Sequence, residues 1–572
     1  MPDAEGRRMR AREAYSRVAP RVNGIDKLVL DDKNCCQGRF FMRSRMHNAI
    51  SYTHGSMPLK RRMGRAAGRG RNKEEWGMYH PTLEEAKQIA ETEAYRVIPV
   101  SMEIYSDIGT PIEVLRRLKK VSRYCYILES VEQTRKWGRY TFLGYEPRLQ
   151  ITCLNGRMTV NGGMRQTQET VNPGAYIREI LKQYKSPRLQ KLPPFTGGLV
   201  GYFSYDYIKY SEPSLKLNAA DSEGFSDVDL MLFDKVIAFD NLRQKIILIT
   251  NAQADDLETS YPRAMRELGE MAALIRSGEK ADIDPLVRIS DYRYLFSKEE
   301  YCEMVGRAKH YIREGDIFQV VLSNRIEADM EGSLFDLYRV LRTTNPSPYM
   351  FYFSGDMEIA GASPETLVKR EDGKLYTYPL AGTRPRGATK EEDEALEREL
   401  LSDEKECAEH NMLVDLGRND IGRISQIGSV RVEQYMNIER YSHVMHIGST
   451  VSGMEREDKD ALDAVDAVLP AGTLSGAPKL RACEIINELE DNKRGIYGGA
   501  VGYLDFTGNM DTCIGIRLAF AKNKKIFIRS GAGIVADSVP ENEYQECINK
   551  AKAVMQALEA AEGGIDHDIA DR

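Results

Sequence analysis

The chain of 572 residues is long enough to bury a large core and to form more than one lobe. Its composition, 42% hydrophobic and 29% charged, is that of an ordinary globular protein, and no apolar run approaches the roughly 18 residues of a membrane span. The nine cysteines are scattered without a C-x-x-C pair, which favours the reduced thiols of a cytoplasmic protein over disulfides or a metal knuckle.

The charge is unevenly distributed along the chain. Residues 1–77 hold 18 Lys and Arg against 8 Asp and Glu, a net of +10, so the formal net charge of −6 leaves −16 for the remainder. The Arg- and Gly-rich run at 59–73 has no apolar periodicity and predicts a disordered basic leader. An RNA-binding arm is the alternative, but that run lacks aromatic residues for base stacking, so we expect no nucleic-acid partner.

Ordered sequence is expected to begin near Met78, where capping signals and apolar periodicity first occur. Lys73, Glu74 and Glu75 can be encoded by AAG-GAG-GAA, which contains a bacterial ribosome-binding sequence at a workable distance before Met78. We therefore expect Met78 to be the natural start and residues 1–77 to be translated upstream sequence, with a genuine disordered arm as the alternative.

Residues 78–285 alternate between strand and helix signals. Thr82 and Glu85 form a capping box, which predicts a helix directly after them. A second helix is expected around 255–277, before a polar stretch at 277–285 that marks a boundary. Alternating apolar residues, with turns at Asn-Gly and Asp-Asn, predict strands within 96–105, 124–132, 139–147, 149–163 and 235–251.

Longer helices alternate with strands beyond residue 285. The apolar periodicity predicts helices at 298–314, 331–344, 391–421, 459–468, 478–490 and 540–562. Because hairpin-like strands mix with helices without regular strand–helix–strand units, the predicted fold class is α+β with large antiparallel sheets.

One internal similarity bears on how the two halves meet. The segment GGLVGYF at 197–203 is similar to GGAVGYL at 498–504. Paired glycines before alternating apolar residues indicate strands whose backbones approach closely, so these segments are expected to be equivalent strands that meet in one core. Chance similarity of Gly- and Val-rich strands is the alternative.

A pair of glutamates on a predicted helix face raises the question of a cation. Glu406 and Glu409 are three residues apart, on a face that continues into the apolar residues Leu413 and Leu416. Two carboxylates on an inward face lose hydration and repel each other. A solvated face is the alternative for any such pair.

The same spacing recurs near the C-terminus. Ser538 and Glu541 form a predicted capping box, and Glu543 and Glu546 follow within the helix that it begins. Oxygen ligands without a nearby His or Cys favour Mg²⁺ over zinc, and Mg²⁺ usually takes one or two carboxylates directly. The two pairs are therefore candidate ligands of one Mg²⁺ ion.

Several loops are suited to an anion. Gly531 and Gly533 follow a strand, where small residues let backbone N–H groups approach a carboxylate. The glycine-rich loop at 469–479 lacks the phosphate-binding G-x-x-x-x-G-K pattern. Arg517 lies in an apolar strand and needs either a structural ion pair or a substrate carboxylate. His446, also in a strand, is either a hydrogen-bonded core histidine or a functional one.

Six motifs, collinear within residues 95–557, carry a resemblance to a known family. They are GASPETLVK at 361–369, PLAGTRPRG at 379–387, DEKECAEHNMLVDLGRNDIGR at 403–423, LPAGTLSGAPK at 469–479, YGGAVGY at 497–503 and GAGIVADSVPENEYQECINKA at 531–551. The chain resembles the chorismate-utilising enzymes and, among them, the anthranilate synthase component I type.

The resemblance implies an organisation for the whole chain. It implies an α+β fold in which two large antiparallel β-sheets pack into a core and are surrounded by helices, in two lobes. Residues 78–285 correspond to an N-terminal regulatory lobe, residues 286–562 to a chorismate-binding catalytic domain, and residues 563–572 to a disordered tail.

The resemblance also implies roles for individual residues. Glu409 and Glu546 match the principal Mg²⁺ ligands, supported by Glu406 and Glu543. Glu365 matches the general acid that protonates the departing C4 hydroxyl, His446 a catalytic histidine near the ring, and Thr473 a residue that packs against the ring. The positions that match chorismate contacts are Gly382, Thr383, Tyr497, Arg517, Gly531, Ala532, Gly533 and Lys550.

Two positions separate the reactions within this family. Members that add water place a lysine base where this chain has Gln319, and aminodeoxychorismate synthases place a lysine nucleophile where it has Ala381. The resemblance therefore implies direct attack by ammonia and loss of pyruvate to give anthranilate. Alternatives are a 2-amino-2-deoxyisochorismate or aminodeoxychorismate synthase, or a non-catalytic regulator that binds tryptophan or chorismate.

Ammonia implies a partner. The chain contains no G-x-C-x-G nucleophile motif of a glutamine amidotransferase, so the resemblance implies a separate amidotransferase subunit (component II) in a heterotetramer.

A second ligand is also implied. Segments 128–130 and 345–350 resemble the tryptophan-sensing pocket of the family, although a strand end and a proline-rich turn are the simpler alternatives. The matching positions are Glu129, Ser130, Pro348, Tyr349, Met350, Val501 and Tyr503.

Overall fold

The structure is a computed structural model that describes residues 79–130, 138–441 and 444–565. The predicted basic leader at 1–77 and most of the predicted tail at 563–572 lie outside the described residues. The described residues all belong to one compact unit. The cysteines in the described ranges are free, as their scattered spacing predicts.

Within the described residues the strands form a 14-stranded and a 12-stranded sheet, and neighbouring strands in both are antiparallel. The first sheet, in spatial order, contains β1 (Tyr79–His80), β2 (Val97–Tyr105), β11 (Lys245–Gln253), β10 (Lys235–Asp240), β4 (Tyr140–Tyr145), β3 (Cys125–Glu129), β15 (Tyr349–Ser354), β16 (Glu358–Ser363), β25 (Leu518–Lys522), β26 (Lys525–Ile534), β14 (Gln319–Glu331) and β12 (Val287–Arg288), with β13 (Arg293–Tyr294) and β22 (Gly476–Ala477) also paired to β14.

The second sheet is built in the same way. In spatial order it contains β19 (Leu380–Pro385), β21 (Val444–Met454), β18 (Lys374–Thr377), β17 (Thr366–Glu371), β24 (Met510–Ile514), β23 (Ala500–Asp505), β8 (Gly198–Phe203), β9 (Val228–Phe233), β5 (Leu149–Leu154), β6 (Arg157–Gly162) and β7 (Met164–Glu169), with β20 (Arg431–Arg440) paired to β21.

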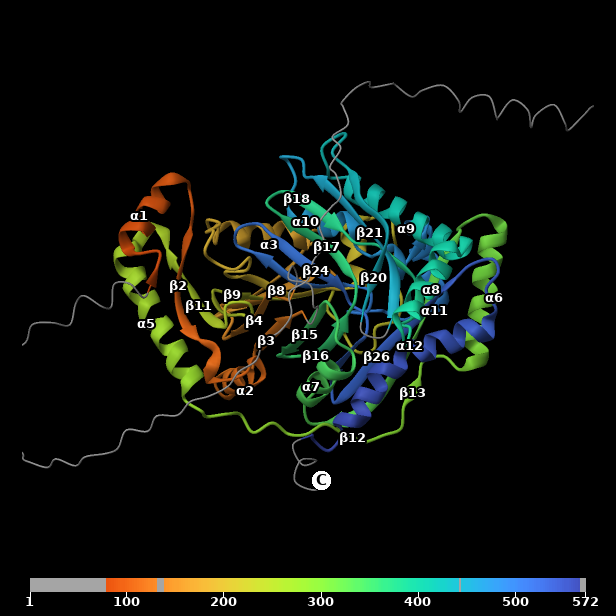
Figure 1. Ribbon diagram of the computed structural model, residues 1–572, viewed down its shortest axis with the longest axis horizontal. Coiled ribbons are helices and arrows are strands. Elements are labelled where there is room, and N and C mark those ends of the chain that lie inside the picture. The colour runs from red at the N-terminus through yellow and green to blue at the C-terminus, as the bar shows by residue number, and fades with distance from the viewer. Residues whose placement is uncertain (1–78, 131–137, 442–443, 566–572) are drawn as a thin grey trace, which may run out of the picture. The chain divides into compact units, whose positions relative to one another are not determined.

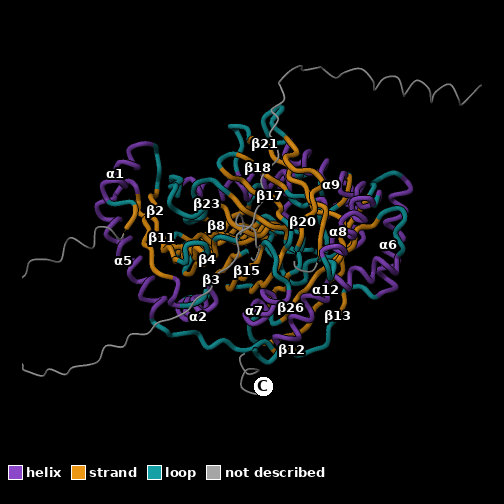
Figure 2. The backbone as a smooth tube through the Cα atoms, viewed as in Figure 1, coloured by secondary structure: helices purple, strands orange, loops and turns teal. Residues whose placement is uncertain are grey.

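Helices surround the two sheets, as Figure 2 shows with helices in purple and strands in orange. In Figure 1, α1 and α5 lie beside β2 and β11, and α12 lies beside β26. The helices are α1 (Leu83–Thr92), α2 (Pro111–Val121), α3 (Pro173–Lys182), α4 (Ile208–Ser211), α5 (Leu257–Arg276), α6 (Lys298–Glu314), α7 (Phe335–Thr344), α8 (Lys390–Ser402), α9 (Glu404–Gly422), α10 (Ala461–Val468), α11 (Lys479–Glu490) and α12 (Pro540–Ala561).

An aromatic core joins the facing sides of the two sheets. Tyr126 on β3 packs edge-on against Phe233 on β9 with ring centroids 4.7 Å apart, and Phe142 on β4 meets Tyr503 on β23 at 6.3 Å. Because such rings bury large apolar areas, this layer contributes strongly to stability. The predicted α+β fold with two packed antiparallel sheets is confirmed.

Both sheets run continuously through strands that come before and after residue 285. In the first sheet β3 pairs with β15, and in the second β8 pairs with β23. Gly201 lies opposite Gly502, so the similar segments 197–203 and 498–504 are antiparallel neighbours and the prediction that they meet in one core is confirmed. A Cβ atom on either glycine would lie 2.1 Å from a backbone oxygen of the adjacent strand.

Most predicted helices are present, including the capped helix after Thr82 and the helix at 298–314. The prediction of one helix over 391–421 is wrong, because Asp403 leaves the helical conformation and its side chain accepts from the N–H groups of Lys405 and Glu406 to cap α9. The Ser538–Glu541 capping box is also wrong. The Ser538 hydroxyl accepts instead from the N–H of Val535, and α12 begins without a side-chain cap.

The close approach at Gly502 predicts a strong effect of adding one methyl group. Gly502→Ala would place Cβ 2.1 Å from the oxygen of Asp511, which is backbone and cannot yield, so the free energy of unfolding should fall by about 3 kcal/mol or more. Denaturant unfolding measures this loss. Gly269→Ala in α5 is the control, because nothing lies within 4 Å of that position and Ala favours a helix. Unchanged stability of Gly502→Ala would contradict the register of β23.

Candidate functional site

Glu365 lies between β16 and β17, with its carboxyl group among residues from distant segments. The hydroxyl of Thr473 donates to its Oε1 at 3.2 Å. Burial raises the pKa of Glu365 to about 8, although the charges of Arg517 and Lys550 oppose the rise. The carboxyl group therefore carries a proton at neutral pH, as a general acid must.

His446 projects from β21 towards β19. Its Nδ1 lies 2.8 Å from the carbonyl oxygen of Gly382 and 3.1 Å from the hydroxyl of Thr383. Because a carbonyl oxygen only accepts, Nδ1 carries the hydrogen and Nε2 keeps its lone pair. Burial lowers the pKa of His446, so the neutral ring is favoured. The histidine is hydrogen-bonded, as the simpler alternative expected, and it also lies among the predicted substrate contacts.

The register between β19 and β21 shifts between Ala381 and Arg384, and this irregularity presents Gly382 and Thr383. Gly382 has a φ of 66°, which favours glycine, and a Cβ atom there would lie 3.2 Å from Oε2 of Glu406. The substrate-binding turn predicted from the motif therefore lies directly beside one of the predicted metal ligands.

Arg517 is the candidate for binding a carboxylate. Arg517 lies in the bend between β24 and β25 rather than within a strand, and its side chain is accessible to solvent. Desolvation by the surrounding protein nevertheless lowers the pKa of its guanidinium, and Tyr441 and Glu365 oppose this shift only in part. Within the described ranges no carboxylate lies within 4.0 Å of it, so the structure shows no ion pair that would make this arginine structural. Its φ of 50° places it in a sparsely populated backbone region, as is common at functional sites.

Three side chains gather over the glycines of β26. Lys550 donates to the backbone oxygen of Gly531 at 3.2 Å. A Cβ atom on Gly531 would lie 3.1 Å from the hydroxyl of Tyr497, and one on Gly533 would lie 2.7 Å from Nε2 of Gln319. The predicted contacts at 531–533, Tyr497 and Lys550 are therefore brought together, with Gln319 beside them.

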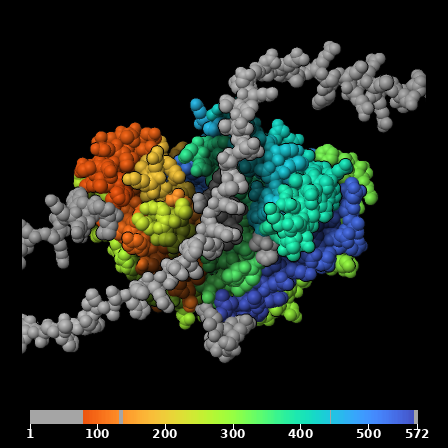
Figure 3. Space-filling view, in the orientation of Figure 1, coloured from red at the N-terminus to blue at the C-terminus, as the bar shows by residue number. Residues whose placement is uncertain are grey.

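The two glutamate pairs, on α9 and α12, are near enough for the charge of Glu546 to act on Glu409. In Figure 3 the blue surface of the C-terminal residues adjoins the teal and cyan surface of residues near 400. Burial, with the charges of Glu406 and Glu546, raises the pKa of Glu409, and burial with Glu546 raises the pKa of Glu543. Lys550 forms an ion pair with Glu546 at 2.7 Å. Across the described part of the chain, no three or more Asp, Glu, His or Cys side chains converge on a single metal position.

A buried charge network beneath this site was not predicted from the sequence. Arg494 and Arg529 both bond to the carboxylate of Glu490, at 2.5 Å and 2.8 Å, and these three side chains are at most 2% exposed. Arg494 also donates to the backbone oxygen of Leu474, next to Thr473, at 2.6 Å. The sequence feature that could have indicated this network is the pair Glu490 and Arg494, which are opposite in charge and four residues apart at the end of α11.

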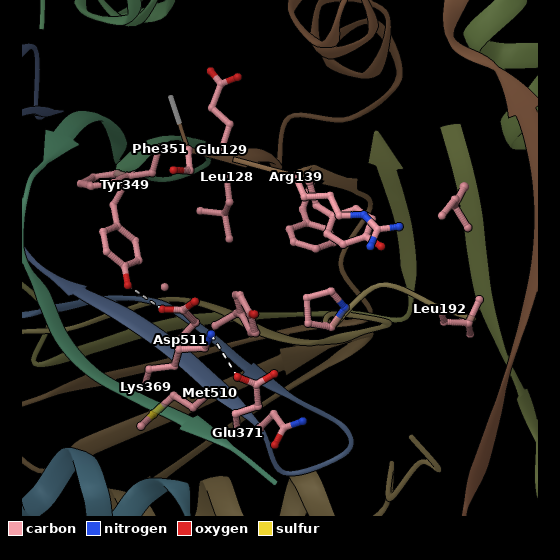
Figure 4. A pocket seen from close by; sticks show the side chains of 18 of the residues that line it. Leu128, Glu129, Arg139, Leu192, Tyr349, Phe351, Lys369, Glu371, Met510 and Asp511 are labelled. Carbon is pink, nitrogen blue, oxygen red and sulfur yellow. Dashed lines mark hydrogen bonds and ion pairs between the residues drawn. The ribbon is translucent and has the colours of Figure 1, made fainter. Parts of the chain in front are cut away.

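A cavity of about 1010 Å³ lies where β3 meets β15 and β23 meets β24. All seven residues predicted for tryptophan line it: Glu129, Ser130, Pro348, Tyr349, Met350, Val501 and Tyr503. Figure 4 shows the Tyr349 hydroxyl and the Asp511 carboxylate directed at each other, at 2.8 Å. The carboxylate of Glu129 points away and bonds instead to Arg342 and Tyr338.

Several charged residues of the cavity were missed, and two of them lie beside the predicted set. Asp511 and Lys369 lie on the neighbouring strands β24 and β17, and burial raises the pKa of Asp511. The signal that could have found Asp511 is a single acidic residue in the otherwise uncharged strand sequence MDTCI.

Comparison with known proteins assigns the chain to a family. A family model described as chorismate binding enzyme matches residues 123–556. The chain is 48% identical over 503 residues to anthranilate synthase component 1 of Acetivibrio thermocellus, covering 85% of this chain and 99% of that protein. It is 46% identical over 488 residues to anthranilate synthase component 1 of Aquifex aeolicus, covering 84% and 98%. The chain belongs to the chorismate binding enzymes.

Solved structures agree with the fold. Anthranilate synthase component I from Streptococcus pneumoniae TIGR4 is 41% identical, with a TM-score of 0.66, and the match covers 79% of this chain and 98% of that one. The menaquinone-specific isochorismate synthase MenF from Escherichia coli shares the fold at 19% identity and a TM-score of 0.61, covering 83% and 98%. Among the described residues, no helix is both long and apolar enough to cross a membrane.

The raised pKa of Glu365 predicts the pH dependence of activity. Because the carboxyl holds its proton below pH 8 and loses it as the pH rises through about 8, kcat/KM for chorismate should fall above that pH. Glu365→Gln should lower kcat about 100- to 10,000-fold and remove this alkaline limb. A pH–rate profile of both proteins measures the effect, and an unchanged limb in Glu365→Gln would assign the titration to another group.

Proposed function

We propose that the protein is the component of an anthranilate synthase that converts chorismate and ammonia to anthranilate, pyruvate and water. The observation that carries the proposal is a buried Glu365, whose pKa burial raises to about 8, in a site where Gln319 and Ala381 stand in place of lysines. Water needs a base to attack, whereas ammonia is already a nucleophile, so the absence of a lysine at these two positions favours ammonia. The relatives named anthranilate synthase component 1 support the same reaction.

The side chains have distinct tasks in this proposal. Arg517, Lys550 and the backbone N–H groups around Gly531 offset the two negative charges of chorismate. Glu365 donates its proton to the departing C4 hydroxyl oxygen, and Thr473 holds the orientation of that carboxyl group. The neutral His446 keeps a lone pair on Nε2 that can accept a proton as the ring becomes aromatic.

The donor set fits a hard divalent cation. The four glutamates supply only oxygen. Burial and, after it, the charge of neighbouring glutamates raise the pKa of Glu409 and Glu543, and a positive ion between the two helices would offset both effects. We propose that Glu409 and Glu546 hold Mg²⁺ directly and that Glu406 and Glu543 support them. When bound, Mg²⁺ would neutralise and orient a substrate carboxylate.

Ammonia would come from glutamine through a separate amidotransferase subunit, and the two kinds of subunit would form a heterotetramer in the cytoplasm. The component 1 name shared by the relatives supports a second component. Free ammonium should replace it in vitro. Incubation of the purified chain with chorismate, Mg²⁺ and ammonium should give the fluorescence of anthranilate, and formation of isochorismate or aminodeoxyisochorismate as the final product would overturn the proposal.

Removing one carboxylate tests the metal assignment. Glu409→Gln should lower turnover at limiting Mg²⁺ more than about 100-fold while leaving the fold intact, because the half-buried side chain faces other carboxylates rather than the core. Mg²⁺ with chorismate should also raise the melting temperature of the wild type and not of the variant. Glu404→Gln, an exposed position in the same helix, is the control. Near-normal turnover of Glu409→Gln would refute the assignment.

We further propose that L-tryptophan binds in the cavity and inhibits the enzyme. The cavity combines apolar walls such as Met350 and Val501 with the carboxylate of Asp511, which suits an aromatic amino acid with an α-ammonium group. Inhibition would follow if the ligand favours an arrangement of the two sheets with a poorer active site.

Filling the cavity should remove this inhibition. Ser130→Phe adds a ring at the cavity wall, so the concentration of tryptophan for half inhibition should rise at least about tenfold with little loss of uninhibited activity. Ser106→Phe, at a similarly half-buried serine outside the cavity, should be inhibited like the wild type. Unchanged inhibition in Ser130→Phe would rule out this cavity.

A further inference from the structure

A chain of hydroxyl groups leads from the cavity towards the active site. The Tyr349 hydroxyl donates to Oδ1 of Asp511 at 2.8 Å and lies 2.8 Å from the hydroxyl of Thr366. The hydroxyl of Tyr349 has only one hydrogen, and it donates this hydrogen to Asp511. The hydroxyl of Thr366 must therefore donate to the oxygen of Tyr349. Tyr349 and Asp511 line the cavity, whereas Thr366 is buried and does not.

Thr366 is the residue directly after Glu365. The pairing of β17 with β24 shifts register between Thr366 and Val368, so the regular ladder is interrupted next to the general acid. Thr366 lies opposite Cys513, which itself lines the cavity. The backbone oxygen of Glu365 accepts from the N–H of Ile514 at 3.0 Å. The backbone contact of Glu365 and the side-chain contact of Thr366 therefore both connect the general acid to residues at the cavity.

We propose that Tyr349 and Thr366 couple the cavity to the general acid, so that a ligand displacing the Tyr349 hydroxyl or engaging Asp511 moves the carboxyl group of Glu365 away from Thr473. This inference rests on the proposed function, since it specifies how an amino acid in the cavity would inhibit. Thr366 and the hydroxyl of Tyr349 act as positioning groups in it and touch no reacting atom.

Two other contacts of the cavity, those of Glu129 and Lys369, lead away from Glu365. Glu129 connects the cavity to Arg342 and Tyr338 on α7, a helix that packs against β15 and β16 and contributes none of the proposed catalytic side chains. Lys369 pairs with Glu371 at 3.3 Å, further along β17 from the general acid. From Tyr349, by contrast, one hydrogen bond and one peptide bond reach Glu365.

Thr366→Val tests the coupling, because valine keeps the size of threonine and removes only its hydroxyl. The variant should bind tryptophan in calorimetry with the dissociation constant of the wild type within about threefold, yet be inhibited at concentrations about tenfold higher, a change within the usual range of allosteric coupling. Thr366→Ser should restore inhibition, since it restores the hydroxyl. Thr512→Val is the matched control: it also loses a buried hydroxyl bond in the same strand pair, but that bond goes to the backbone oxygen of Val368.

A double-mutant cycle distinguishes a loss of coupling from a general loss of stability. Tyr349→Phe removes the same hydrogen bond from the other side, so Thr366→Val combined with Tyr349→Phe should weaken inhibition no more than the stronger single change. Wild-type inhibition of Thr366→Val at equal tryptophan occupancy, or additive effects in the double variant, would overturn the coupling. A wild-type protein that forms no anthranilate or binds no tryptophan would instead overturn the proposed function, and the coupling with it.

Discussion

The buried carboxylate of Glu490 is the constraint on which the site depends. Two guanidinium groups, of Arg494 and Arg529, and the N–H and hydroxyl of Ser323 all bond to it. Burial alone would raise the pKa of Glu490, but Arg494 and Arg529 hold it below its ordinary value. Since loss of one partner from such a buried set costs about 3–5 kcal/mol, the segments that carry these groups have one stable arrangement.

That arrangement decides where the catalytic groups lie. Arg494 bonds to the backbone of Leu474 and of Val321, and Arg529 lies on β26 two residues before Gly531. The loop with Thr473, the strand that begins at Gln319 and the glycines of β26 are thus attached to the same charged centre. Thr473, whose hydroxyl donates to Glu365, is therefore held at a defined distance from β26, the strand proposed to bind the substrate.

The acidic groups of the site differ in how their negative charge is avoided or offset. Glu365 is placed near Thr473. Burial raises its pKa more than Thr473 and the charges of Arg517 and Lys550 lower it, so the carboxyl group keeps its proton at neutral pH. Glu409 and Glu543 are less enclosed and lie near other carboxylates, where a divalent cation is the natural way to offset the repulsion. The continuity of both sheets through β3–β15 and β8–β23 then brings a cavity within one hydrogen bond of the residue after Glu365.

The sequence by itself determined the features that depend on near neighbours along the chain. The Thr82 capping box, the hairpin within 149–163 and the helix at 298–314 follow from side chains a few residues apart, and the motifs were enough to indicate the family and candidate site residues. Only the tertiary structure decided the break at Asp403, the role of Ser538, the Glu490 network and the link from Tyr349 to Thr366. The Glu490 network and the link from Tyr349 to Thr366 join segments far apart in sequence, as when Tyr349 meets Asp511. Asp403 and Ser538 bond to residues only two or three positions away, but the sequence alone offered each of them more than one such partner. Because an unpartnered buried polar group is costly, each group takes the partner that the packed structure brings to it.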